Sequence, residues 1–240
     1  MKSEQRNSRF TNVPTVHNLT RRAFTGLIEL QVVMALLLFL PAGSLAFWQG
    51  WIYWTLFLLC VVGITLYFLK YDPHLIEGRL AAGPRAEQEP IQKVIQAIAA
   101  VLFFAALIIP ALDHRFRWSQ LPPAIVVLGD ILLVMSLAII FFVFKENSYA
   151  ASTIKVETEQ RVIRTGPYRM VRHPMYSAAL ILFLATPLAL GSAWGLLVSI
   201  PLIGVLLARL TNEERYLSTH LAGYNTYRQQ VGYRLVPFIW

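Results

Sequence analysis

Long apolar runs separated by short polar stretches make up most of this chain. A transmembrane α-helix needs about 20 mainly apolar residues, and the first four runs meet that length. The last two runs are shorter and are joined by Leu190-Gly191-Ser192-Ala193, which predicts a tight helical hairpin or a tilted pair. We therefore expect an all-α, polytopic transmembrane bundle with about six spans, five being the alternative. The runs cover residues 24–47, 51–69, 94–112, 124–144, 175–189 and 194–210.

The positive charges follow this pattern. Six spans place both termini on the same side, and all but two of the 21 Lys and Arg residues then fall on that side. The two exceptions are Arg115 and Arg117. Because basic residues accumulate in cytoplasmic loops, we expect both termini to be cytoplasmic. Trp48, Trp118 and Trp194 fall at the three outer turns, as expected for aromatic residues at headgroup level.

The composition indicates an integral membrane protein with a single domain, residues 1–240. The chain is 56% hydrophobic and 14% charged, well below the roughly 25% charged residues of soluble domains. The net charge of +8 comes from residues beside the apolar runs, so we expect the lipid bilayer, and not nucleic acid, as the partner. Cys60 and the scattered histidines show no metal-ligand spacing, so we expect no metal site.

Three of the polar segments outside the runs bear on the organisation of the chain. Residues 1–23 form a polar N-terminal segment that is long for the lead of a signal peptide, so we expect the first run to be retained. Residues 145–174 form the longest polar segment between runs. Residues 211–230 carry apolar positions near helical spacing, which predicts an amphipathic C-terminal helix. We expect residues 145–240 to carry the chemistry.

The segment 166–176, with the sequence GPYRMVRHPMY, is the most informative polar stretch. It places two Arg, a His and two Tyr directly before an apolar run. Gly166-Pro167 is a turn signal. His173-Pro174 places His173 at or near the N-cap of the fifth span, where free backbone N–H groups and the helix dipole favour anionic groups. An interfacial anchor is the alternative interpretation.

A second polar group follows the last apolar run. Arg209 and Glu213 are four residues apart and so share one helix face, next to Glu214. They form either a surface ion pair or a pair that grips a charged ligand at the membrane boundary. Tyr224 and Tyr227 are three residues apart, and they either pack in the protein or form an aromatic wall for a sulfonium cation.

These motifs resemble those of the isoprenylcysteine carboxyl methyltransferase superfamily, which also includes phospholipid and bacterial thiol methyltransferases. The resemblance rests on the segment 166–176, on Arg209-x-x-x-Glu213-Glu214 and on Tyr224-x-x-Tyr227-x-x-x-Val231. It covers about the last 80 residues, and the first 145 carry no diagnostic motif. The family usually has Phe-Gly between the glutamates and the first tyrosine. This chain has another sequence there, so the alignment of Glu213 against Glu214 stays open.

The resemblance implies an integral membrane enzyme that uses S-adenosylmethionine in a cytoplasm-facing pocket. Arg209, Glu213 and Glu214 are then the candidate catalytic residues, with Arg209 facing the substrate. The cofactor is expected to contact the segment before the motif, several residues within it and the first glutamate. These residues are Gln160, Arg161, Val162, Ile163, Tyr168, His173, Pro174, Met175, Tyr176 and Glu213.

The residue types suit methyl transfer. A carboxylate accepts hydrogen bonds from ribose hydroxyls or an ammonium group, and Arg209 can hold an acceptor carboxylate through two hydrogen bonds. We expect a lipophilic or membrane-delivered acceptor, with a carboxylate such as that of isoprenylcysteine as first choice. A phospholipid amine or a small thiol is the alternative. More distant alternatives are an NADPH-dependent membrane reductase of the sterol reductase type and a small transporter.

Overall fold

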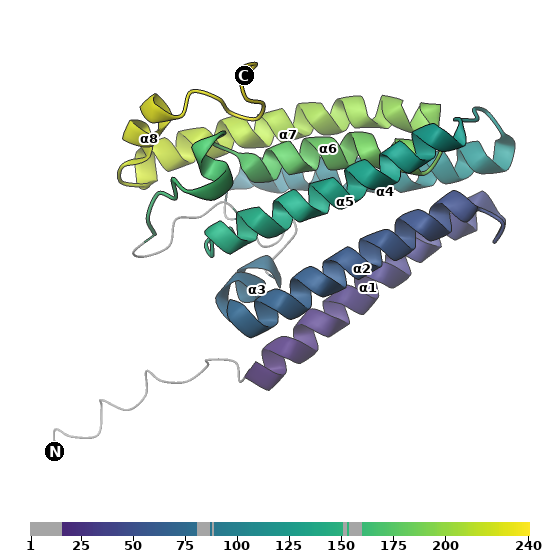
Figure 1. Cartoon of the computed structure of the whole chain (residues 1–240), viewed down its shortest axis with the longest axis horizontal. Coiled ribbons are helices and arrows are strands. Elements are labelled where there is room, and N and C mark those ends of the chain that lie inside the picture. The colour runs from purple at the N-terminus through teal and green to yellow at the C-terminus, as the bar shows by residue number, and fades with distance from the viewer. Residues whose placement is uncertain (1–15, 81–86, 88, 151–152, 154–159) are drawn as a thin grey trace.

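The computed structural model describes residues 16–80, 87, 89–150, 153 and 160–240. All regular elements within these ranges are helices, which confirms the expected all-α bundle. The long helices run antiparallel to one another along the chain (Figure 1). The elements are α1 (Val16–Ala42), α2 (Trp48–Tyr71), α3 (Pro73–Leu80), α4 (Pro90–Phe116), α5 (Pro123–Glu146), the 3-10 helix η1 (Gly166–Arg169), α6 (Pro174–Ala189), α7 (Ala193–His220) and α8 (Tyr224–Gln230).

Five of the described helices, α1, α2, α4, α5 and α7, are long and apolar enough to cross a membrane. The sixth apolar helix, α6, has 16 residues. At 1.5 Å per residue it is about 24 Å long, somewhat short of a hydrocarbon layer about 30 Å thick. It nevertheless runs antiparallel to α5 and α7, so the chain makes six passes along the bundle (Figure 1). Helix α1 therefore begins at the end where η1 and α8 lie, which we call the motif end.

The last apolar run lies in a helix long enough to span a membrane, as predicted, but the helix boundaries after it differ from the prediction. The run 194–210 lies within α7, whose 28 residues make it the longest helix that the structure describes. This helix continues through most of the predicted amphipathic segment 211–230 and ends at His220. Residues 211–220 contain no Gly or Pro to stop it. The break comes at Gly223, whose φ of 82° suits glycine, and the short α8 follows.

The other differences concern helix ends. Helix α1 starts at Val16, inside the predicted polar segment 1–23, of which residues 1–15 lie outside the described part. It ends at Ala42, before the end of the predicted run, because Gly43 turns the chain with a φ of 62°.

Helix α3 was not predicted. It follows α2 after Asp72, whose carboxylate accepts a hydrogen bond from the Leu75 N–H.

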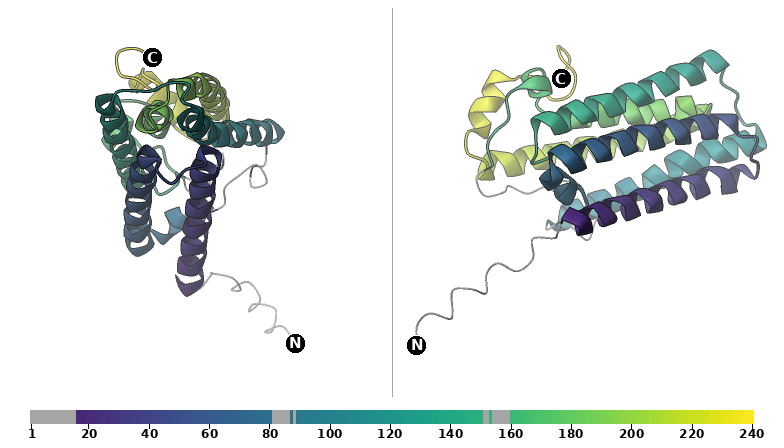
Figure 2. Two further views of the ribbon diagram at one scale, coloured as in Figure 1. Left: turned by 90° about the vertical axis from the view of Figure 1, so that its right-hand side faces the viewer. Right: turned by 60° about the horizontal axis from the view of Figure 1, so that its bottom comes forward.

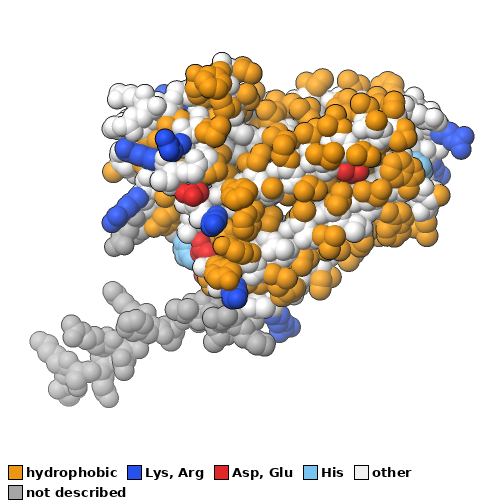
Figure 3. Space-filling model, viewed as in Figure 1, with side chains coloured by type: hydrophobic (Ala, Val, Ile, Leu, Met, Phe, Trp, Pro, Cys, Tyr) orange, Lys and Arg blue, Asp and Glu red, His pale blue; other side chains and the backbone are white. Residues whose placement is uncertain are grey.

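The bundle buries an apolar core and presents a second apolar surface to its surroundings. Leu38, Leu107 and Leu133, from α1, α4 and α5, are fully buried in one cluster. Ile28 and Leu40 are more than 60% exposed, as expected for side chains that face lipid. Figure 3 shows hydrophobic side chains along the visible face and charged side chains mainly at the motif end, with a smaller basic group opposite.

Helices α1 and α2 lie to one side of α5, α6 and α7 (Figure 2). The closest helix contact lies between α5 and α6. A Cβ atom on Gly129 would lie 2.2 Å from the Ala189 nitrogen, so only glycine permits this approach. Further along, the Ser136 hydroxyl donates a 2.8 Å hydrogen bond to the Ala178 carbonyl. Small residues and serine hydroxyls of this kind join helices within membranes. This contact fixes α6, which carries the motif at its start, against α5.

We predict that Gly129→Ala destabilises the protein by about 1–3 kcal/mol, because α6 must move away from α5. The matched control is Gly63→Ala in α2, where nothing lies within 4 Å of the added Cβ. That variant should unfold at the temperature of the unaltered protein or slightly above it. Thermal unfolding in detergent micelles measures both. Equal melting temperatures for the two variants would contradict the close α5–α6 contact.

Candidate functional site

A cavity of about 450 Å³ opens at the motif end of the bundle. Every residue predicted to contact the cofactor lines it, namely residues 160–163, Tyr168, residues 173–176 and Glu213. Arg209 lines it as well. Glu214, the third predicted catalytic residue, is not part of this lining. The structure thus gathers residues from the segment before η1, from η1, α6 and α7 around one space.

The motif has a defined local structure. Gly166 has a φ of 54°, and a Cβ at this position would meet the Glu146 side chain at 2.5 Å, so the turn needs glycine. The 3-10 helix that follows carries Tyr168, whose hydroxyl accepts a 2.8 Å hydrogen bond from the Asn147 amide. Burial raises the pKa of Tyr168 to about 12, so its hydroxyl stays protonated. His173 is the N-cap of α6 and Pro174 its first residue, as predicted.

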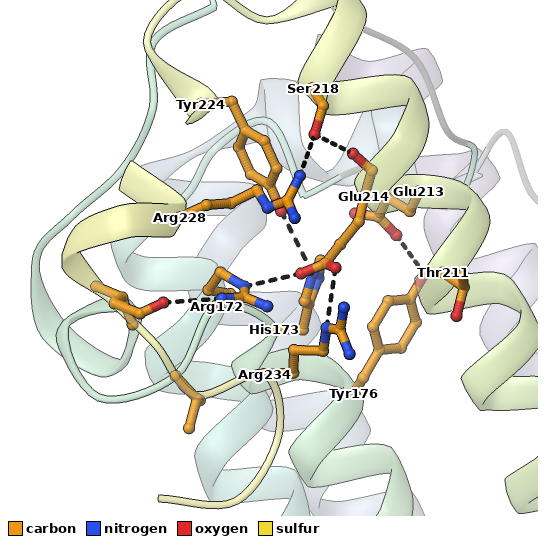
Figure 4. A network of polar contacts seen from close by, with 12 residues as sticks. Arg172, His173, Tyr176, Thr211, Glu213, Glu214, Ser218, Tyr224, Arg228 and Arg234 are labelled. Atoms are coloured by element: carbon orange, nitrogen blue, oxygen red, sulfur yellow. Dashed lines mark hydrogen bonds and ion pairs between the residues drawn. The ribbon is translucent and has the colours of Figure 1, made fainter. Parts of the chain in front are cut away.

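Glu214 lies behind the cavity wall at the centre of a buried charge cluster (Figure 4). Its carboxylate accepts hydrogen bonds from Arg172 Nε at 2.8 Å and from Arg234 Nε at 3.0 Å. His173 Nε2 lies 3.2 Å from the same carboxylate. Glu214, Arg172 and His173 are each less than 10% exposed. We call these four residues the Glu214 cluster. It joins α7, the motif and the C-terminal segment, residues 231–240.

Backbone contacts extend this attachment. The N–H groups of Arg172 and His173 donate to the carbonyls of Tyr233 and Arg234, at 2.9 and 3.0 Å. The Arg172 guanidinium also donates to the carbonyls of Val231 and Gly232. The C-terminal segment therefore forms an outer layer over the motif. Arg234 was not among the residues predicted for the site, and Arg172 was expected only as one more basic residue of the motif. One signal for the backbone pairing of residues 172–173 with residues 233–234 was available in the sequence. A residue that precedes proline is usually extended, and extended backbone can pair with another segment.

Glu213 and Glu214 are neighbours that point in different directions. Successive helical residues are about 100° apart around the axis, so one carboxylate reaches the Glu214 cluster while the other faces the cavity. Glu213 accepts a hydrogen bond from the Tyr176 hydroxyl, which comes from the first turn of α6 (Figure 4). The two glutamates therefore have different surroundings, which the sequence alone did not distinguish.

Arg209 lies one turn before Glu213 on the same helix face. Its Nη2 donates a 2.9 Å hydrogen bond to Glu87, a buried carboxylate between α3 and α4. Gln92 lies 3.5 Å from Arg209 Nη1, and Gln96 donates to Glu87 at 2.5 Å. The sequence analysis did not identify these three partners. Gln92 and Gln96 are four residues apart on α4 and so share a face, which is the signal it could have used.

Tyr224 and Tyr227 of α8 are both buried and both line the cavity. The Tyr227 hydroxyl donates a 2.8 Å hydrogen bond to the Tyr168 carbonyl, which ties α8 to η1. The Tyr224 hydroxyl lies 3.4 Å from His173 Nε2. Burial raises the pKa of both phenols, so they remain neutral. These contacts support a packing role, and the aromatic rings also form part of the wall.

The cavity also has an apolar part, which we call its apolar wall. It consists of side chains from α4, α5, α6 and α7, at positions further along the bundle than the motif. They are Ala99 of α4, Ile140 and Phe144 of α5, Ala179 of α6 and Leu206 of α7. One space therefore has a polar wall at the end of the bundle and an apolar wall among the membrane helices. Among the described residues, no group of three His, Cys, Asp or Glu is arranged to hold a metal ion.

We predict that Glu214→Gln destabilises the fold while Glu213→Gln does not. Removing one partner of a buried ion pair typically costs about 3–5 kcal/mol, because the remaining charges stay buried without compensation. Thermal unfolding should show a large loss for Glu214→Gln, and amide hydrogen exchange should speed up at Arg172 and His173. Glu213→Gln is the control, because it faces the cavity and keeps an oxygen for Tyr176. Equal stability of the two variants would contradict the assignment.

Comparison with known protein families finds one similarity, in the second half of the chain. Residues 124–223 match the model of the phospholipid methyltransferase family. No curated protein matches the chain. The matched range begins in α5 and ends just before α8, so it includes the motif, Arg209 and both glutamates. The match confirms the resemblance drawn from these motifs. Residues 124–223 are thus similar to the phospholipid methyltransferase family.

Proposed function

We propose that this protein is an S-adenosylmethionine-dependent methyltransferase that methylates a lipophilic acceptor within the membrane, with a carboxylate as the first choice of acceptor. One observation carries the proposal. The cavity joins a polar wall, formed by the motif and Glu213, to an apolar wall among the membrane helices. A polar cofactor and a lipophilic acceptor need a meeting place of this kind.

The polar wall suits S-adenosylmethionine. Residues 160–163, Tyr168, residues 173–176 and Glu213 would hold it, with Glu213 accepting hydrogen bonds from its hydroxyl or ammonium groups. The aromatic rings in the same wall suit a sulfonium cation. His173 Nε2 lies next to Glu214 and Tyr224, so this nitrogen would help to hold the polar wall in place. When bound, the cofactor supplies an electrophilic methyl group on sulfur.

The apolar wall suits the acceptor. An alkyl or prenyl chain would lie against Ile140, Ala179 and Leu206, with its polar end toward the motif. Arg209 would then hold a carboxylate through two hydrogen bonds, while Glu87 keeps the guanidinium in place. A carboxylate needs no base to accept a methyl group. The protein contributes mainly by holding two reactants in line, which alone accelerates such reactions strongly.

A phospholipid amine is the second candidate acceptor, favoured by the family model that residues 124–223 match. A neutral amine loses a proton during methylation, and Glu213, a carboxylate among the described lining residues, could accept it. A small thiol is the third candidate. We also propose that the motif end faces the cytoplasm, because basic residues predominate on this side of the six passes.

We predict that the purified protein transfers radiolabelled methyl groups from S-adenosylmethionine to a prenylcysteine acid, giving a base-labile ester. Arg209→Gln should lower kcat/KM by about 100-fold, because a charge-assisted contact to the reacting group is lost. Arg22→Gln on the exposed surface of α1 is the matched control and should keep full activity. Label in a base-stable phospholipid would favour the amine acceptor instead.

Calorimetric titration with both cofactors separates the enzyme classes. Binding of S-adenosylmethionine at micromolar concentration is the expected result. Binding of NADPH without S-adenosylmethionine would contradict the proposed function and favour a membrane reductase. Binding of neither cofactor would favour a transporter. Arg22→Gln again serves as the control, because any change in its affinity would indicate a general effect of removing a surface charge.

A further inference from the structure

Residues 235–240, at the end of the C-terminal segment, form an exposed turn that we call the apolar turn. Val236 and Trp240 exchange two backbone hydrogen bonds of 3.2 Å, which close the turn. Between them, Phe238 has a φ of 66°, which is uncommon for a bulky side chain. Phe238 and Ile239 are 86% and 80% exposed, the highest fractions among the large hydrophobic side chains that the structure describes. The turn therefore presents its apolar side chains outward.

The base of the apolar turn is fixed on α6 and α7. Leu235 is buried in a cluster with Tyr176 of α6 and with Leu206 and Leu210 of α7. The Ser177 hydroxyl donates a 2.6 Å hydrogen bond to the Leu235 carbonyl. Tyr176 and Ser177 belong to the first turn of α6, so the apolar turn lies at the level where this apolar helix begins. This level is the end of the hydrophobic part of the bundle.

The apolar turn continues a surface that suits lipid. Figures 1 and 2 show the C end of the chain at the outer edge of the bundle, beyond α7 and away from α1 and α2. Leu207 of α7 packs against the cluster that holds Leu235. Ile200 lies seven residues before Leu207, on the same helix face, and is 65% exposed. Because α7 is long and apolar enough to cross a membrane, this face leads through the hydrocarbon layer to the apolar turn.

Aromatic and basic side chains accompany the exposed apolar ones. The Arg234 guanidinium lies 4.8 Å from the centre of the Trp240 ring. The rings of Tyr233 and Phe238 lie 5.4 Å apart. Tryptophan and tyrosine favour the level of the lipid headgroups, and arginine keeps its charged end in water while its stem lies against apolar groups. This combination is typical of a segment that lies in the interfacial layer of a bilayer.

We propose that the apolar turn docks into the interfacial layer of the bilayer and thereby holds the C-terminal segment on the motif. The same segment supplies Arg234 to the Glu214 cluster. Its carbonyls at Tyr233 and Arg234 accept hydrogen bonds from the N–H groups of Arg172 and His173. Because Arg234 directly precedes the turn, lipid contact at the turn restrains the segment that covers the motif. The bilayer is then a structural partner of the polar site, whether or not the protein transfers methyl groups.

Spin labelling of the full-length protein in phosphatidylcholine nanodiscs tests the location of the turn. The chain has one cysteine, so Ile239→Cys in a Cys60→Ala background gives a single labelled position. We expect this label to be more accessible to oxygen, which concentrates in lipid, than to a water-soluble nickel chelate. Gln229→Cys in the same background, at an exposed position of α8, is the matched control. It should show the opposite order.

Two outcomes of the spin-label experiment would overturn the inference. A label at position 239 that the nickel chelate reaches as readily as the label at Gln229 would place the turn in water. Low accessibility to both reagents, together with dipolar broadening between labels, would assign the turn to a contact between two copies of the chain. Neither outcome bears on S-adenosylmethionine binding, so the inference and the proposed function can fail separately.

Amide hydrogen exchange in the same nanodiscs tests the link between the turn and the motif. Replacing both Phe238 and Ile239 with serine removes the lipid contact and keeps the other contacts of the segment. Exchange at the Arg172 and His173 amides should then accelerate on the order of 10-fold, because the segment that accepts from them opens more often. Leu45→Ser, at an exposed position between α1 and α2, is the matched control and should leave this exchange unchanged. Unchanged exchange in the double variant would overturn the proposed link.

Discussion

The buried carboxylate of Glu214 is the interaction on which the polar part of this structure depends. It lies within 3.2 Å of cationic groups or imidazole from Arg172, His173 and Arg234. These partners come from segments that are far apart in the chain, because the motif precedes α6 and Arg234 follows α8. A charge buried in this way is stable only while its partners remain. The position of the motif against α7, and hence the shape of the cavity, therefore follows from this cluster.

The adjacent glutamates show how one helix supports both stability and chemistry. Glu214 is committed to the cluster, so the helix fixes the direction of Glu213, about 100° around the axis. Tyr176 then meets Glu213 from α6. Arg209, one turn earlier, is fixed by Glu87 in the same manner. Side chains that are held by a second layer of contacts keep the geometry that binding and methyl transfer need.

The sequence predicted the features that the bilayer and local geometry determine. Apolar length identified the spans, since each backbone polar group in lipid must be satisfied within a helix. Because proline is tolerated in the first turn of a helix and disfavours helical backbone in the residue before it, the sequence placed His173 at the start of α6. The spacing of residues 211–230 predicted a helix but not its continuity with the last span as far as His220, where contacts of Glu214 with distant segments support the polar extension. Glu87 could not be predicted as a site residue, because its partner Arg209 lies 122 positions away in the chain.

The shortness of α6 explains why the cavity lies where it does. Helices α6 and α7 begin their hairpin together at Leu190–Ala193, so after 16 residues α7 reaches Arg209 at the level where α6 starts. Helix α7 continues past this level, and α6 does not. The cavity lies at this level, lined by Arg209 and by the first turn of α6. The C-terminal segment covers the motif through the backbone contacts of Arg172 and His173, while side chains of α4, α5, α6 and α7 line the other part of the cavity. Because α6 starts late, the polar residues of the motif lie beside α7 at this end of the bundle, which supports the proposal that a polar cofactor and a lipophilic acceptor meet there.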